Sequence, residues 1–194
     1  GDYYDVVKLR NGEICILIGD VSGKGISAAF YMAQLKGVVL SEALESDSGL
    51  ELLSKINLVL YKNIESQMFI TMSAITINSK SNSVRIVRAG HMPFLLRKGE
   101  IVSEIITKGI GIGLAGHKIF DKHLEDKEIS LMTGDLLVMF TDGLNEVRDK
   151  SGNEFGLDSL LKLVENSNGD DSNCLVTQIQ KSIDTFNRIL LYIL

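Results

Sequence analysis

Strand-forming and helix-forming segments occur in separate runs along this sequence of 194 residues. Two β-rich runs at residues 6–9 and 13–19 flank Asn11-Gly12, a dipeptide typical of tight hairpins. Segments with helical spacing follow at residues 26–43 and 50–64, and more strand-like runs come after them. Ser46, Asp47 and Ser48 offer caps before the second of these helices. Because α/β folds alternate strands with helices, this blockwise order predicts an α+β fold. We expect two mainly antiparallel sheets packed on each other, with helices outside.

The rest of the chain continues in blocks and shows no internal boundary. We expect further strands at residues 69–77, 83–89, 94–97, 101–106 and 136–140, an edge strand within 120–131, and helices at 157–164 and 174–186. Pro93 is the only proline, and neither a low-complexity linker nor a repeat is visible. We therefore expect a single domain over residues 1–194. Since the chain begins at Gly1 rather than Met, we also expect it to be a piece of a longer regulatory protein.

Charge and cysteine content narrow the functional classes. The formal net charge is -5 and no Lys or Arg run dominates a segment, so a nucleic-acid groove is not expected. Cys15 and Cys174 stand far apart and form neither a disulfide framework nor a zinc pattern. No apolar stretch reaches the ~20 residues of a membrane span. We expect a cytoplasmic domain that makes no membrane contact itself.

Two aspartates each follow an apolar strand and stand close to a glycine. Asp20 comes after residues 14–18 and before the turn Val21-Ser-Gly-Lys-Gly25, and Asp142 comes after residues 136–140. A single aspartate in such a place is more often a turn cap. A carboxylate at the end of a dry strand is costly unless a cation or donors satisfy it. The repeated arrangement therefore favours a cation site.

Other side chains could complete such a site. Asp2 and Asp5, on either side of two tyrosines, could supply a third carboxylate. Oxygen ligands without His or Cys point to Mg²⁺ or Mn²⁺ rather than zinc. Glu146, four residues after Asp142, either supports the local turn or holds a water beside the metal. His91 is either a general acid or, more commonly for a histidine in a turn, a residue whose ring hydrogen-bonds the backbone.

Three other ligand-binding patterns are excluded by spacing. Only three residues separate Gly19 from Gly23, and Lys24 is followed by glycine, so the nucleotide P-loop is absent. The glycine spacing of the dinucleotide fingerprint is absent as well. Residues 149–160 do not form an EF-hand, because their sixth and twelfth positions are Glu and Leu.

Five sequence blocks, in order, resemble the SpoIIE/RsbU branch of the metal-dependent type-2C (PPM) serine/threonine phosphatases. The blocks are Gly1-Asp-Tyr-Tyr-Asp5; Gly19-Asp-Val-Ser-Gly-Lys-Gly25 with Ala28-Ala29 and Met32-Ala33; Phe69-Ile-Thr71; Ala89-Gly-His-Met-Pro93; and Gly134-Asp-Leu-Leu-Val-Met-Phe-Thr-Asp-Gly-Leu-Asn-Glu146, ending near Glu154-Phe-Gly156. The likeness extends from residue 1 to about residue 165. Any block alone is weak, but all five in order are specific.

The resemblance implies a four-layer αββα sandwich with a two-metal centre. By position, the ligands of two Mn²⁺ or Mg²⁺ ions would be Asp2, Asp20 with the main-chain carbonyl of Val21, and Asp142. The metals would activate a water that attacks phosphorus in line, so no residue of the protein serves as nucleophile.

The resemblance also implies a bacterial signalling role. The substrates would be phosphorylated anti-sigma-factor antagonists, and an upstream sensor or a homodimer partner would act on the helix that starts at Ile26. Asp5 is a less secure ligand, because its position is less tightly specified. Lys24 and His91 would be structural or substrate-side positions.

Two features depart from the family pattern. A strand that usually precedes the first aspartate block is absent. An acidic pair that usually supplies a further ligand near the end is replaced by Asn187-Arg188, before an apolar run that resembles the family's final strand. Asp184 is the nearest substitute for this ligand. The alternative hypothesis is therefore a catalytically weak or inactive phosphatase-like module that acts in partner binding or oligomerisation.

Overall fold

The computed structural model describes all residues except 66, 79–80, 82, 168–171 and 188–194. The chain divides into two compact units. Unit 1 comprises Gly1–Pro93 and Ile106–Met132, and unit 2 comprises Phe94–Ile105 and Thr133–Leu194.

Unit 1 is built on a five-stranded antiparallel sheet with the order β1-β2-β3-β4-β7. Its strands are β1 Asp2–Lys8, β2 Ile14–Val21, β3 Ile70–Ile77, β4 Ser83–Ala89 and β7 Asp126–Ser130. The expected hairpin joins β1 to β2. Gly12 takes a positive φ of 89°, and the Leu9 amide donates to the Glu13 carbonyl at 2.8 Å.

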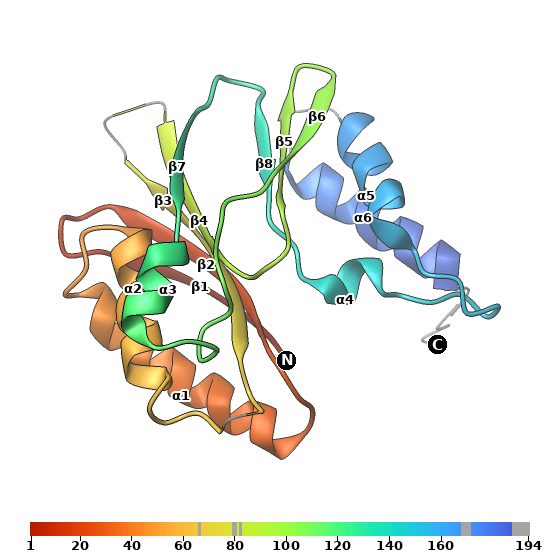
Figure 1. Ribbon diagram of the computed structural model, residues 1–194. Helices are drawn as coiled ribbons and strands as arrows, with labels where there is room; N and C mark the ends of the chain where they lie inside the picture. The colour runs from red at the N-terminus through yellow and green to blue at the C-terminus, as the bar shows by residue number, and fades with distance from the viewer. Residues whose placement is uncertain (66, 79–80, 82, 168–171, 188–194) are drawn as a thin grey trace. The chain divides into compact units, whose positions relative to one another are not determined.

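Three helices of unit 1 lie on one face of this sheet (Figure 1). They are α1 Ile26–Ala43, α2 Gly49–Leu60 and α3 His117–His123. The core between helices and sheet includes Leu17, Leu35, Leu53, Ile56, Met72 and Phe120, all without exposed surface. Ser48 caps α2 as expected, because its hydroxyl accepts the Glu51 amide at 3.1 Å.

One helix of unit 1 was not predicted from the sequence. Residues 120–131 were expected to hold an edge strand, and α3 occupies residues just before that strand. Phe120 points from α3 into the core against α2, and this tertiary contact outweighs a short segment's weak local preference. The edge strand itself is present as β7, paired with β4.

Unit 2 is built on a three-stranded antiparallel sheet with the order β6-β5-β8. Its elements are β5 Phe94–Lys98, β6 Ile101–Ile105, β8 Leu136–Val138, α4 Asp142–Asn145, α5 Gly156–Glu165 and α6 Ser172–Asn187. Helix α5 contacts β5, β6 and α6. Buried Arg97 donates to the carbonyls of Ser167 and Gly134, which ties β5 to the end of α5 and to the loop before β8.

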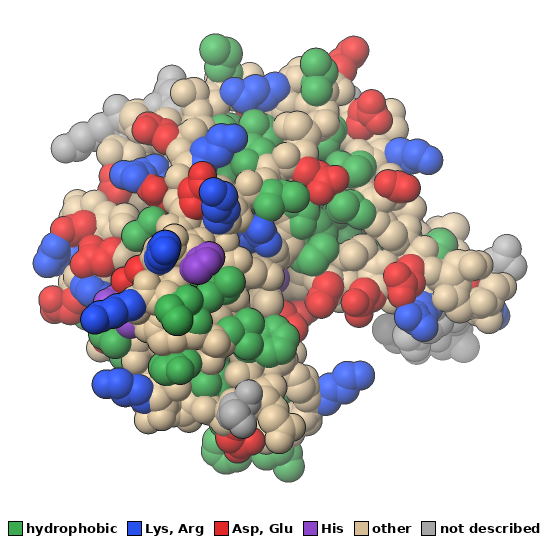
Figure 2. All heavy atoms as spheres, viewed as in Figure 1, with side chains coloured by type: hydrophobic (Ala, Val, Ile, Leu, Met, Phe, Trp, Pro, Cys, Tyr) green, Lys and Arg blue, Asp and Glu red, His purple; other side chains and the backbone are tan. Residues whose placement is uncertain are grey.

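The expected α+β class, with two antiparallel sheets and flanking helices, is confirmed. The expected final strand after Arg188 lies outside the described residues. Within the part of the chain that the structure describes, no helix is long and apolar enough to cross a membrane. On the face drawn in Figure 2, basic and acidic side chains are interspersed rather than gathered into a basic stripe.

Candidate functional site

Three polar side chains form a row across the first three strands of unit 1. The register places Asp2 of β1 opposite Asp20 of β2, and Asp20 opposite Thr71 of β3. Side chains directly opposite in a sheet share a face, with Cβ atoms about 5 Å apart. Tyr3 and Met72, one residue along their strands, belong to the helix-covered core. The row therefore lies on the face opposite the helices.

Two oxygen atoms at the end of β2, one from the Asp20 side chain and one from the Val21 main chain, accept hydrogen bonds from the same amino group. The α-ammonium group of Gly1 donates to Asp20 Oδ1 at 2.7 Å and to the Val21 carbonyl at 2.8 Å. The Asp20 Oδ1 and the Val21 carbonyl oxygen therefore point toward the same place, and both are hard oxygen donors of the kind that Mn²⁺ and Mg²⁺ bind. The Asp20 side chain keeps 26% of its surface exposed, so the pair remains accessible. These residues fit a divalent cation.

Close strand packing sets the position of Asp20. A Cβ atom at Gly19 would lie 2.5 Å from the Thr71 carbonyl oxygen, so only glycine allows this approach of β2 to β3. Beyond the strand end, the Ser22 amide donates to the Phe69 carbonyl at 3.0 Å, and the Phe69 amide donates to Ser22 Oγ at 2.9 Å. The turn after Asp20 is thereby anchored to β3.

Asp5 lies on the other face of β1 from Asp2, because side chains three residues apart on a strand point in opposite directions. Its Oδ2 accepts from Lys36 Nζ at 2.5 Å and from the Tyr3 hydroxyl at 2.9 Å. Burial by itself would raise the pKa of the Asp5 carboxyl, but these hydrogen bonds hold that pKa below its usual value. The Asp5 carboxylate therefore belongs to the contact between β1 and α1, and we do not propose it as a metal ligand.

We expect Asp5→Asn to lower the free energy of unfolding at pH 7 by about 1 kcal/mol. A lowered pKa in the folded state stabilises the protein above the unfolded-state pKa near ~3.9, and this contribution is lost as pH falls through the folded-state value. The deficit of the variant should therefore shrink on acidification, as measured by urea unfolding at pH 7 and pH 3. Asp126→Asn, which breaks an exposed pair with Arg85, is the control for a surface charge. A deficit that stays constant down to pH 3 would contradict the ionic origin.

His91 lies beside the row in unit 1 and is only 5% exposed. Its Nδ1 is 2.9 Å from Thr71 Oγ1, so the imidazole contacts the residue that faces Asp20 across the strands. The His91 ring thus bonds a side chain of this row, and its general-acid and structural roles both stay predictions. Lys24, in the turn after β2, is exposed, and its expected structural or substrate-side role stays a prediction.

Asp142 and Glu146 belong to unit 2. Asp142 is the first residue of α4 and is half-buried, and its carbonyl accepts the Glu146 amide at 2.9 Å. The Glu146 side chain is exposed. The main-chain bond agrees with a turn-supporting place for Glu146, while the ligand role of Asp142 stays a prediction.

Among the described residues, no group of three or more His, Cys, Asp and Glu side chains is arranged to hold a metal ion. Asp184, the expected substitute ligand, is exposed on α6 and accepts from Gln180 Nε2 at 3.1 Å, one helical turn earlier. Arg188 lies outside the described residues. The structural support for a cation therefore comes from Asp20 and Val21, with Asp2 beside them.

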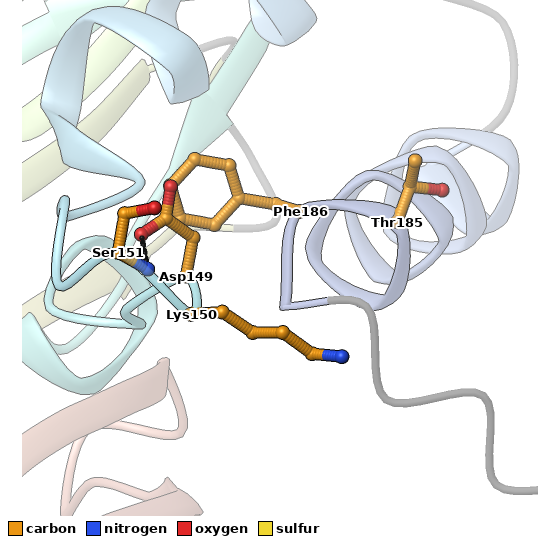
Figure 3. A pocket seen from close by; sticks show the side chains of 5 residues that line it. All are labelled: Asp149, Lys150, Ser151, Thr185 and Phe186. Carbon is orange, nitrogen blue, oxygen red and sulfur yellow. Dashed lines mark hydrogen bonds between the residues drawn. The ribbon is translucent and has the colours of Figure 1, made fainter.

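A hollow in unit 2 is lined by Asp149, Lys150, Ser151, Thr185 and Phe186 (Figure 3). The Asp149 carboxylate is turned back into its own loop, where it accepts the amides of Ser151 at 2.8 Å and Asn153 at 2.9 Å. A third bond, from Asn153 Nδ2, and these amides together lower the pKa of Asp149. The Asp149 carboxylate thus closes the turn of its own loop.

Two features near the row were not identified from the sequence. Arg88 directly precedes the Ala89–Pro93 block, and residues 107–113 form a connection with glycine at alternate positions. A Cβ atom at Gly109 would lie 1.7 Å from the Arg88 carbonyl oxygen. The alternating glycines were the available sign that two backbones come into contact there.

Comparison with known proteins gives a consistent result. The family model described as Stage II sporulation protein E (SpoIIE) matches residues 10–189. Phosphoserine phosphatase RsbU of Bacillus subtilis (strain 168) is 34% identical over 157 residues, which cover 78% of this chain and 44% of RsbU. The chain thus spans less than half the length of that relative.

Solved structures show the same fold. The SiaA-PP2C domain of Pseudomonas aeruginosa superposes with a TM-score of 0.79 at 16% identity, covering 96% of this chain and 74% of that one. RsbX in complex with magnesium gives a TM-score of 0.66 at 15% identity, covering 95% and 79%. At such identities the likeness concerns the fold alone, which is that of PP2C-type phosphatases.

Proposed function

Because the chain belongs to the SpoIIE family of PP2C-type phosphatases, we propose that it removes phosphate from phosphoserine or phosphothreonine on a partner protein. The substrate is a phosphorylated protein of the anti-sigma-factor antagonist type. Two Mn²⁺ or Mg²⁺ ions would be held by Asp2, Asp20, the carbonyl of Val21 and Asp142. The observation that carries this proposal is the convergence of Asp20 Oδ1 and the Val21 carbonyl oxygen, which lie 2.7 and 2.8 Å from the same nitrogen atom of Gly1.

The residues of the site suit metal-dependent hydrolysis. Bound divalent ions supply a water of lowered pKa and neutralise charge on the phosphate. Asp2 and Asp20 contribute carboxylates from neighbouring strands of a rigid sheet, so their positions are set by main-chain pairing. Burial raises the pKa of the Cys15 thiol to about 12, which argues against this cysteine as a nucleophile. The magnesium bound to RsbX supports the choice of ion.

We expect the protein to release phosphate from a phosphoserine peptide when Mn²⁺ is present. EDTA should abolish turnover, and added Mn²⁺ or Mg²⁺ should restore it. Without a cation, the negatively charged carboxylates of the site would repel the phosphate group. Phosphate release is measured colorimetrically, with heat-denatured protein as the control. Turnover that is insensitive to EDTA would contradict the proposal.

A catalytically weak or inactive module that acts in partner binding or oligomerisation is the second candidate. It is favoured by the exposed position of Asp184, whose carboxylate is bonded to Gln180 within the same helix. Calorimetric Mn²⁺ titration beside the phosphatase assay separates the two candidates. Binding of Mn²⁺ without turnover would favour the inactive module, and binding with turnover would exclude it.

A further inference from the structure

Arg88, near the end of β4, is a half-buried cation whose hydrogen bonds go to main-chain carbonyls. Its Nη1 donates to the His91 carbonyl at 2.5 Å, and its Nη2 donates to the Thr107 carbonyl at 2.8 Å. Burial lowers the pKa of this guanidinium. A desolvated charge is costly unless donors and acceptors compensate it, and here the two main-chain carbonyls do so.

The two carbonyls belong to the two backbone segments that meet beside the row of Asp2, Asp20 and Thr71. The guanidinium is planar, and its donors are fixed relative to one another, so the two bonds set the spacing of these segments. The segments are also closely packed, because a Cβ at Gly90 would lie 2.8 Å from the Gly111 amide nitrogen. Little movement is available to either segment.

A chain of contacts leads from Arg88 to Asp20. Arg88 holds the main chain of His91, the His91 ring bonds the Thr71 hydroxyl at 2.9 Å, and Thr71 is the cross-strand partner of Asp20. Arg85, on the same strand, lacks this connection. It is exposed and pairs with Asp126 on β7.

We propose that Arg88 is a positioning residue, which acts through the His91 ring and the Thr71 hydroxyl to set the geometry of Asp20 for metal binding. The inference rests on the proposed function, since it assumes that Asp20 holds a metal. It assigns Thr71 and His91 to the same network, in which Thr71 is the residue directly opposite Asp20 on the neighbouring strand.

Mn²⁺ affinity of the whole chain, measured by calorimetry, tests the network without relying on turnover. Thr71→Val keeps the shape and removes the hydroxyl, and it should weaken Mn²⁺ binding about 10-fold. Thr71→Ser keeps the hydroxyl and should bind like the original protein. Arg88→Met should weaken binding by a similar factor, whereas Arg85→Met should leave it unchanged. Thermal unfolding confirms that each variant is folded.

The double variant Thr71→Val/Arg88→Met identifies the route of the effect. If Arg88 acts through Thr71, the Mn²⁺ affinity of the double variant should be no lower than that of whichever single variant binds Mn²⁺ more weakly. Additive losses, or a folded Thr71→Val protein with unchanged affinity, would overturn the network. If Arg88→Met does not fold, the comparison of Thr71→Val with Thr71→Ser still tests whether the Thr71 hydroxyl supports Mn²⁺ binding. Absence of Mn²⁺ binding by the original protein would instead overturn the proposed function, and the role of the network with it.

Discussion

Asp20→Asn should lower kcat/KM for a phosphoserine peptide at least about 100-fold, which corresponds to about 2.7 kcal/mol. The substitution keeps the size of the side chain and removes the negative charge that would bind the cation. Asp20 Oδ1 and the Val21 carbonyl oxygen converge in the structure, so loss of the carboxylate leaves two neutral oxygen donors. Phosphate release and calorimetric Mn²⁺ affinity should fall together, because both depend on metal occupancy.

Asp5→Asn is the matched control for this loss. It removes the same charge from a neighbouring strand, but its carboxylate faces Lys36 and Tyr3 on the helix-covered side. We expect it to lower stability and to leave Mn²⁺ affinity unchanged. If Asp20→Asn retained both Mn²⁺ binding and turnover, Asp20 would not be a ligand.

Gly109→Ala should lower the free energy of unfolding by about 2–3 kcal/mol or more, or prevent folding. The added Cβ would stand 1.7 Å from the Arg88 carbonyl oxygen and 2.8 Å from the Arg88 carbonyl carbon. These atoms belong to the main chain of β4 and cannot turn aside as a flexible side chain would. Chemical denaturation of the whole chain, monitored by far-UV circular dichroism, measures the loss.

Gly37→Ala, within α1, is the control for this substitution. A Cβ at Gly37 meets nothing within 4 Å, and alanine is the better helix former. We expect this variant to gain about 0.5–1 kcal/mol. Equal stability of Gly109→Ala and the original protein would show that the two backbone segments can separate at little cost.

Most element positions of unit 1 could be predicted because their causes are local. The Asn11-Gly12 turn, the Ser48 cap and the apolar spacing of residues 26–43 each act within a few residues, and the structure has the hairpin, the cap and α1 Ile26–Ala43. The error at α3 had the opposite cause. Seven residues carry too little local preference, and the burial of Phe120 against α2 decided their form.

Two of the candidate metal ligands could also be predicted from local sequence. Asp20 and Asp142 each directly follow an apolar strand, where a carboxylate is costly unless a cation or donors satisfy it. The strand alternation that separates Asp2 from Asp5 was also present in the sequence, since residues an odd number apart face opposite sides of a strand. Asp142, in unit 2, remains a predicted ligand.

The sequence by itself determined the strands and helices, the hairpin and the carboxylates suited to a hard cation, because those properties depend on neighbouring residues. Only the tertiary structure decided which partners surround Asp20. Thr71 lies opposite Asp20 through strand register, the His91 ring bonds Thr71, and Arg88 bonds the main chain of His91 beside the closely packed residues 107–113. Thr71, Arg88 and His91 each lie 50 or more positions after Asp20 in the sequence. Strand register and contacts between distant backbone segments bring them together, and no local sequence pattern encodes such a pairing.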